Sequence, residues 1–376
     1  SNVTAGNVGD VSLSSAAAIN DDGLAGTVIT ADVFTATAAG AMTLDTSVNS
    51  IDLTTSAAGD IDVDEANAVT LTNITAADGS ITVDAGGAIG VTSVVSSTDA
   101  DANDVSLTTT SGDITISNVT AGNVGDVSLS SAAAINDDGS AGTVIAADIL
   151  TATAAGAMTL DTTANSVDLT TSAAGDIDVD ETNAVTLTNI TAANGSITVD
   201  AGGAITVTSV VSSTDADAND ISLTTTSGDI TVNTITAGSV GDVNLTSAAA
   251  INDDGSAGTV ITADVLTATA VGAMTLDTTV NSIDLTTSAA GNIDVDETNA
   301  VTLTNITAAD GSITVDAGAA IGVTSVVSST DADANDISLT TTSGDITVNT
   351  INAGSVGDVN LTSAAAINDD GSAGTV

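Results

Sequence analysis

Carboxylates are the only side chains in this sequence that readily ionise, and they recur at regular positions. The chain has 376 residues, of which 49 are Asp or Glu, and it contains no Lys, Arg, His, Cys or Tyr. Carboxylates can act as catalytic acids and bases, or as hard oxygen ligands for cations such as Ca²⁺. The spacing of these residues decides which chemistry to expect.

Three aspartates in each of three segments end short stretches in which apolar and polar residues alternate. We expect the first set, Asp45, Asp64 and Asp84, to point outward about 5 Å apart on three stacked strands. Asp62 and Glu65 lie beside the middle member. Stacked carboxylates raise one another's pKa and favour Ca²⁺, although diffuse Na⁺ around a solvated acidic face is the alternative. The later sets of predicted cation ligands are Asp161, Asp180 and Asp200, then Asp277, Asp296 and Asp316.

Two loops are further candidates for calcium. The segment STDADAND places Asp99, Asp101 and Asn103 in an alternating oxygen pattern, but it lacks the glycine and distal glutamate of an EF-hand. A calcium loop and a plain turn are both open for it. The segment INDDG (residues 19–23) is expected to be a turn.

The composition argues against several classes of function. Without His, Cys, Lys, Arg or Tyr, only a paired-carboxylate hydrolase remains conceivable, and no cleft-forming insertion interrupts the pattern, so we expect no enzymatic activity. The absence of Lys and Arg disfavours binding to nucleic acid or to anionic lipid headgroups. No stretch approaches eighteen consecutive apolar residues, so direct membrane insertion is not expected.

The elements that position these carboxylates are predicted to be short β-strands. In DIDVD, Ile61 and Val63 share one face while the aspartates share the other. In AVTLTNITA, Ile74 follows Leu71 by three positions, so the chain must turn a corner to keep both side chains inside. Val, Ile, Leu and Ala dominate the apolar residues, and 42% of the chain is hydrophobic, which argues against disorder.

A repeat of 116 residues organises these strands. It divides the chain into residues 1–116, 117–232 and 233–348, with a partial fourth copy at 349–376. Strands begin at Asp10, Ala41, Asp60, Ser80 and Asp104, at intervals of 31, 19, 20, 24 and 22 residues to the next repeat. These intervals predict five turns per repeat and sixteen turns in all.

Near-identical turns with two or three strands each indicate an all-β fold, a parallel β-solenoid in which each strand stacks on its counterpart one turn below. A β-sandwich is the rival, but it would need tight hairpin links and protected edges. The repeats are expected to form one continuous solenoid, part of a longer array, whose exposed strand edges favour self-association.

The segments Gly59–Val63, Gly79–Val83 and Gly112–Ile116, each followed by an N-[IV]-T-A-like stretch, resemble the repeats of filamentous haemagglutinin-like adhesins and other giant bacterial surface proteins. This resemblance implies a right-handed β-helix, an extracellular or cell-surface location, and a role as a fibre or adhesin stalk.

The expected function is therefore structural. The sequence predicts the shaft of an extracellular bacterial filament, and the alternative is the stalk of an adhesin whose binding domain lies elsewhere. Sixteen turns at about 4.8 Å each place one negative charge on roughly every 1.5 Å, comparable to DNA, so cations are expected as partners. T-x-T segments such as Thr35 to Thr37 would suit an ice-binding face, but they do not persist through all turns.

Overall fold

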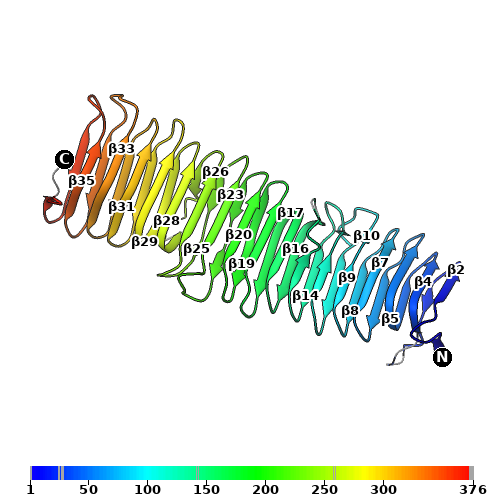
Figure 1. Ribbon diagram of the computed structural model, residues 1–376. Helices are drawn as coiled ribbons and strands as arrows, with labels where there is room; N and C mark the ends of the chain where they lie inside the picture. Colours follow the sequence, from blue (N-terminus) through cyan, green and yellow to red (C-terminus); the bar gives the residue numbers. More distant parts are fainter. Residues whose placement is uncertain are drawn as a thin grey trace. The chain divides into compact units, whose positions relative to one another are not determined.

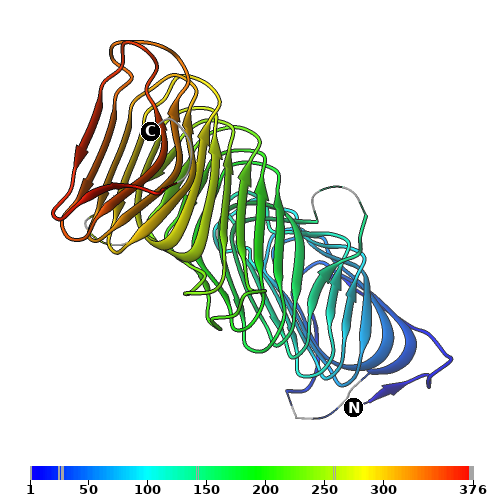
Figure 2. The same cartoon turned by 60° about the vertical axis from the view of Figure 1, so that its left-hand side comes forward.

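The computed structural model describes residues 2–23, 26, 29–140, 142, 144–256, 258 and 260–371. All regular structure in this part of the chain is β-strand, and the paired strands run parallel, so the prediction of a parallel β-solenoid is confirmed (Figure 1). Two compact units can be distinguished, Ser1–Asn183 and Ala184–Val376. In each unit the strands of successive turns stack above one another (Figure 2).

Unit 1 contains strands β1 to β18. Their bounds are β1 Val3–Thr4, β2 Val11–Ser15, β3 Ile19–Asn20, β4 Ile29–Ala38, β5 Met42–Thr55, β6 Ile61–Glu65, β7 Val69–Ala76, β8 Ile81–Ala85, β9 Ile89–Val91, β10 Val94–Ser96, β11 Val105–Thr109, β12 Ile114–Ile116, β13 Val119–Thr120, β14 Val127–Ser131, β15 Ile135–Asp137, β16 Ile145–Ala154, β17 Met158–Thr171 and β18 Ile177–Glu181.

Unit 2 contains strands β19 to β37. Their bounds are β19 Val185–Ala192, β20 Ile197–Ala201, β21 Ile205–Val207, β22 Val210–Ser212, β23 Ile221–Thr225, β24 Ile230–Val232, β25 Ile235–Thr236, β26 Val243–Ser247, β27 Ile251–Asp253, β28 Ile261–Ala270, β29 Met274–Thr287, β30 Ile293–Glu297, β31 Val301–Ala308, β32 Ile313–Ala317, β33 Ile321–Ser328, β34 Ile337–Thr341, β35 Ile346–Asn352, β36 Val359–Thr362 and β37 Ile367–Asp369.

Alternation decides which side chains enter the core. In β6, Ile61 and Val63 are fully buried, whereas Asp62 and Asp64 are exposed. The predicted corner in β7 is also present, because Leu71 and Ile74 are both fully buried although three positions separate them. Since two consecutive outward residues lie between them, the backbone turns there without losing either apolar contact.

Each turn has three faces. The turn that contains β11, β12 and β13 pairs in parallel with β8, β9 and β10 of the turn before it, one strand on each face. We name these faces A, B and C in unit 1. Stacked pairs on the three faces are Ile81 and Val105 on A, Ile89 and Ile114 on B, and Val94 and Val119 on C.

Equivalent residues of successive repeats lie on different faces of unit 1. Met42 of repeat 1 stacks on Ile61 of face A. Met158, 116 residues later, stacks instead on Ile135, which continues face B. Val69 on face B follows Met42 by one turn and one face. The next rungs of face B are Ile89, Ile114, Ile135 and Met158, each one turn further on. One repeat therefore advances by five turns and one further face, so the prediction of five turns is wrong.

Unit 2 shows the same step. Val243 pairs with Leu266 of β28, whereas Val359, one repeat later, pairs with Ile337 on the column that contains Met274 of β29. Since β28 and β29 place these residues on different faces, a repeat again ends one face further on.

The additional face comes from the 31-residue interval between Asp10 and Ala41. Strand β4 lies inside this interval, and its Phe34 stacks between Val11 of β2 and Ile51 of β5. The interval therefore covers one turn and one further face, although its strand starts predict a single long turn. The described chain accordingly has about 17 turns rather than 16, with a spacing of about 21 residues.

Columns of Ile, Leu, Val and Ala fill the interior. Phe34, the single aromatic residue of the chain, is fully buried, and so are its equivalents Leu150 and Leu266. Full burial of such side chains contributes about 1.5–3 kcal/mol each. Three glutamates interrupt this apolar interior, and they lie next to the candidate site.

Candidate acidic groove

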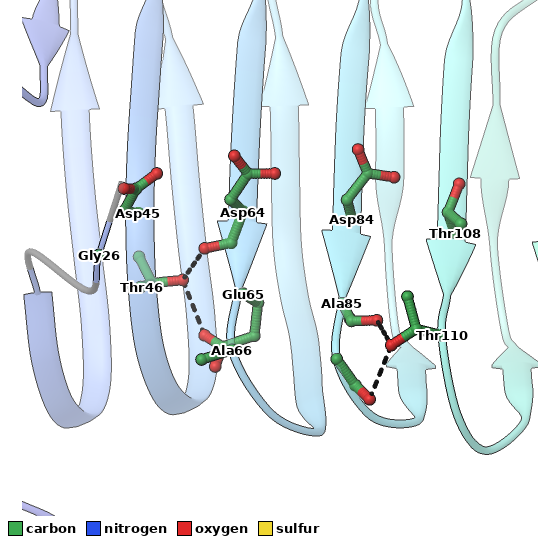
Figure 3. Close-up of a pocket in the computed structure, with 11 residues that line it drawn as sticks. Gly26, Asp45, Thr46, Asp64, Glu65, Ala66, Asp84, Ala85, Thr108 and Thr110 are labelled. Atoms are coloured by element: carbon green, nitrogen blue, oxygen red, sulfur yellow. Dashed lines mark hydrogen bonds between the residues drawn. The ribbon is translucent and has the colours of Figure 1, made fainter. Parts of the chain in front are cut away.

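The first predicted set of aspartates forms a ladder. Asp45 of β5 pairs with Asp64 of β6, and Asp64 pairs with Asp84 of β8, so the three carboxylates project outward from neighbouring rungs (Figure 3). Parallel strands place such residues about 4.8 Å apart. The stacking that we predicted for these three residues is therefore confirmed.

The other two predicted sets of aspartates also pair between neighbouring rungs within the units. Asp277 pairs with Asp296, and Asp296 with Asp316, so unit 2 contains a complete three-rung ladder. In unit 1, Asp161 pairs with Asp180. Asp200 belongs to unit 2, where it pairs with Thr224.

The ladder forms one wall of an open groove of about 570 Å³ in unit 1. Its other lining residues include Gly26, Thr46, Glu65, Thr108 and Thr110 (Figure 3). An equivalent groove of about 430 Å³ lies beside the ladder of unit 2. Residues shared in type and position by the two grooves are Gly258, Asp277, Asp296, Glu297, Asp316, Ala317, Gly318 and Thr342 in unit 2.

The INDDG turn approaches the same ladder, which the sequence did not predict. Asp21, Asp45, Asp62 and Asp64 line one hollow of about 260 Å³. Ile19 and Asn20 of this segment belong to strand β3, and the chain bends after them, where the backbone amide of Gly23 donates a 2.7 Å hydrogen bond to Oδ1 of Asp21. Because Asp21 and Asp45 are distant in sequence, only the stacking of turns brings their negative charges together.

Burial and mutual repulsion raise the pKa of several carboxyls in this region. Partial burial raises the pKa of Asp45, and the neighbouring carboxylate of Asp21 raises it further. For Asp62, burial acts together with the charges of Asp64 and Asp84 to raise the pKa. The pKa values of Asp161, Asp277 and Asp294 are raised in the same way, by burial first and then by nearby aspartates.

Glu65 does not lie among the outward carboxylates, because its position in β6 points inward. It is only 3% exposed. The Thr46 hydroxyl donates a 2.7 Å hydrogen bond to Oε2, and the Asn67 amide donates a 3.0 Å bond to Oε1. The amide of Val48 also donates to this carboxylate, at 3.1 Å. Burial raises the pKa of Glu65, and these hydrogen bonds oppose the rise.

The same arrangement recurs in the next two repeats. Glu181 accepts hydrogen bonds from the Thr162 hydroxyl and the Ala164 amide, and Glu297 accepts them from Thr278 and Val280. These three residues are all the glutamates of the chain. The sequence signal for their role was available, since Glu replaces the more common Asp only at this inward position.

The predicted calcium loop STDADAND is used for contacts between turns. Oδ1 of Asp99 accepts hydrogen bonds of 2.8 and 3.0 Å from the amides of Asn123 and Val124 in the next turn. Asn103 is 6% exposed, and its side-chain amide donates to Oδ1 of Asp78 and to the carbonyl oxygen of Thr98. These groups fasten neighbouring turns and leave Asp101 as an exposed residue of the loop.

Equivalent aspartates make the same contact in unit 2. Asp215 accepts hydrogen bonds from the hydroxyl and amide of Ser239 and from the amide of Val240, and these bonds lower its pKa. Asp331 has the same partners in Ser355 and Val356, with the same effect on its pKa. Such aspartates supply acceptors for corner amides that have no partner in the strand ladders.

The donor set of the groove is suited to hard cations, because carboxylate and hydroxyl oxygens are ligands that Ca²⁺ prefers. Within the described residues, however, no three acidic side chains converge on one point in the manner of a preformed metal cage. The ladder therefore offers a row of carboxylates rather than a closed coordination sphere.

Comparison with family models, curated proteins and solved structures found no match to this chain. The fold itself is consistent with β-helix repeat proteins, since it is a tandem-repeat β-solenoid. Among the residues that the structure describes, no helix has the length and apolar character needed to cross a membrane.

Proposed function

We propose that this chain is the structural shaft of an extracellular bacterial filament or surface fibre. The observation that carries the proposal is the parallel register, which continues from rung to rung within each unit while the outward side chains vary. Hydrogen bonds that run along the stack oppose stretching, and each added turn lengthens the shaft by about 4.8 Å. A solenoid of this kind needs no catalytic machinery, and we propose none.

Immunogold electron microscopy of cells that produce the protein tests this function. Antibodies raised against the purified chain should label filaments or a surface layer on intact cells, with gold particles distributed along their length. Labelling that requires permeabilised cells would contradict the proposal.

The stalk of an adhesin remains the second candidate, supported by the resemblance of segments such as Gly59–Val63 to adhesin repeats. The two roles differ in what surrounds the repeats. A purified filament built from repeats alone would favour the shaft, whereas a non-repetitive domain at the tip that binds host cells or glycans would favour the stalk.

We also propose that the surface takes up cations, with Ca²⁺ at the acidic grooves. About 17 turns share 49 negative charges, so each turn carries about three and has no positive side chain to balance them. At this density counterions must accumulate, as they do around DNA. Bridging cations would also favour association of copies side by side, because they offset the repulsion between carboxylates that no positive side chain balances.

A further inference from the structure

The outer surface of the repeat changes faces together with its core. Thr43 and Thr159 occupy the same position in repeats 1 and 2, and both are exposed. Thr43 pairs with Asp62 on face A, whereas Thr159 pairs with Asn136 on face B. The acidic ladder moves in the same way, from Asp45 on face A to Asp161 on face B.

We infer that each 116-residue repeat presents the same outer surface as the repeat before it, but on the next of the three faces. This shift follows from the register, because a repeat contains five turns and one additional face. With three faces, an identical orientation returns after three repeats, which is 348 residues of this sequence. Three such shifts would display each groove, loop and ladder of the repeat on three sides in turn.

This inference rests on the proposed function for its consequence. A partner that lies along one side of a shaft, such as a second copy of this chain, meets the same surface of the repeat only once in every three repeats. Partners on all three sides can use every repeat. If binding to one repeat is weak, the number of repeats within reach decides the avidity, so three-sided surroundings are favoured over a one-sided sheet.

Pairs of introduced cysteines test this shift by one face per repeat directly, because the full chain contains no cysteine of its own. Stacked residues of parallel strands have Cα atoms close enough for a disulfide. Under mild oxidation, the variant with Asn136→Cys and Thr159→Cys should form an intramolecular disulfide, detected by mass spectrometry. The matched variant with Ser128→Cys and Thr159→Cys should not, although five turns per repeat would stack that pair. Ser128→Cys with Thr151→Cys is the positive control, since these residues are paired.

A distance measurement provides a second test. Thr151 lies five rungs beyond Thr43 on the same face, at a separation of about 24 Å. Spin labels at positions 43 and 159 should therefore be farther apart than labels at positions 43 and 151, because the first pair spans two faces. An equal or shorter distance for the first pair, or a disulfide between positions 128 and 159, would overturn the inference.

These measurements use the isolated chain, so their failure is separate from a failure of the proposed function. Native filaments offer the complementary test of the consequence for assembly. Cross-sections of bundles should show neighbours on three sides, and a flat one-sided sheet would overturn the three-sided display even if the chain is a surface shaft.

Discussion

The hydroxyl of Thr46 donates a 2.7 Å hydrogen bond to Oε2 of Glu65, across two neighbouring turns and almost out of contact with water. The same carboxylate holds the amides of Val48 and Asn67, so a single side chain joins two turns at a corner. Other buried polar side chains also join turns, such as Ser96, whose hydroxyl donates to the carbonyl oxygen of Gly79, but Glu65 is the charged residue among the buried side chains of its repeat.

Replacement of this glutamate should loosen the corner locally. Glu65→Ala removes the carboxylate acceptor of the Val48 and Asn67 amides and leaves the Thr46 hydroxyl only its 3.5 Å contact with the Asp64 carbonyl oxygen, at an expected cost of about 1–3 kcal/mol. Native-state hydrogen exchange should show this cost as faster exchange of the Val48 and Asn67 amides. Glu65→Gln, which keeps one acceptor oxygen, should have a smaller effect, and Asp62→Ala on the exposed face of the same strand serves as the control. Unchanged exchange in Glu65→Ala would show that the hydrogen bonds do not stabilise the corner.

Stability should increase as the pH falls from 7 towards about 4. Burial raises the pKa values of Glu65, Asp45 and Asp62 in the folded state above their unfolded values of about 4.3 and 3.9. A group with a raised folded pKa contributes stability that is present below its unfolded pKa and is lost as the pH rises through its folded pKa. Thermal unfolding at a series of pH values should therefore give a midpoint that rises as the pH is lowered from 7 towards the unfolded pKa values of about 4.

The glutamates allow this prediction to be checked site by site. Since the chain has only three, selective ¹³C labelling of glutamate yields three carboxyl signals, and each should titrate above the ordinary value of about 4.3. Asp215 and Asp331 act in the opposite direction, because their lowered pKa values make their contribution disappear as the pH falls below about 3.9. Signals at the ordinary value, together with a flat thermal profile, would be inconsistent with buried carboxyls.

Calcium binding should depend on the ladder more than on charge in general. The triple variant Asp45→Asn, Asp64→Asn and Asp84→Asn should reduce the calcium heat in titration calorimetry and the change in thermal midpoint that a chelator causes in the parent chain, while the ladder of Asp277, Asp296 and Asp316 retains its share. The control removes the same three charges from separate exposed positions, with Asp101→Asn, Asp217→Asn and Asp333→Asn. Equal losses in both variants would show that the cations are held diffusely.

The contact between Asp99 and the next turn requires a glycine. Gly122 has a φ of +94°, and a Cβ at this position would overlap Oδ1 of Asp99. Gly122→Ala should therefore lower the thermal midpoint through both strain and steric overlap. Gly139→Ala separates the two causes, because Gly139 has a φ of +72° but open space around it. If Gly122→Ala lowers the thermal midpoint no more than Gly139→Ala does, the overlap between the added Cβ and Asp99 does not contribute.

Much of the site was predictable because adjacent rungs have nearly equal lengths. Intervals of 19 and 20 residues place Asp45, Asp64 and Asp84 in register, and the structure reproduces that register. The approach of Asp21 to Asp45 was not predictable, since Asp21 lies inside the 31-residue interval, whose additional face the strand starts do not reveal. From the sequence, Glu65 was placed beside the middle aspartate without a stated direction, although its two-residue spacing from Val63 indicates an inward side chain.

The sequence by itself determined which side chains are buried, where the strands lie and that the turns repeat. Alternation of apolar and polar residues carries that information, because it reports only whether a side chain points inward or outward. The same alternation applies to all three faces, so it cannot tell on which face a strand lies. Only the tertiary structure decided this, through backbone hydrogen bonds between residues about 20 positions apart, such as those that stack Phe34 on Val11 and Met158 on Ile135. Those pairings convert five predicted turns per repeat into five turns and one face.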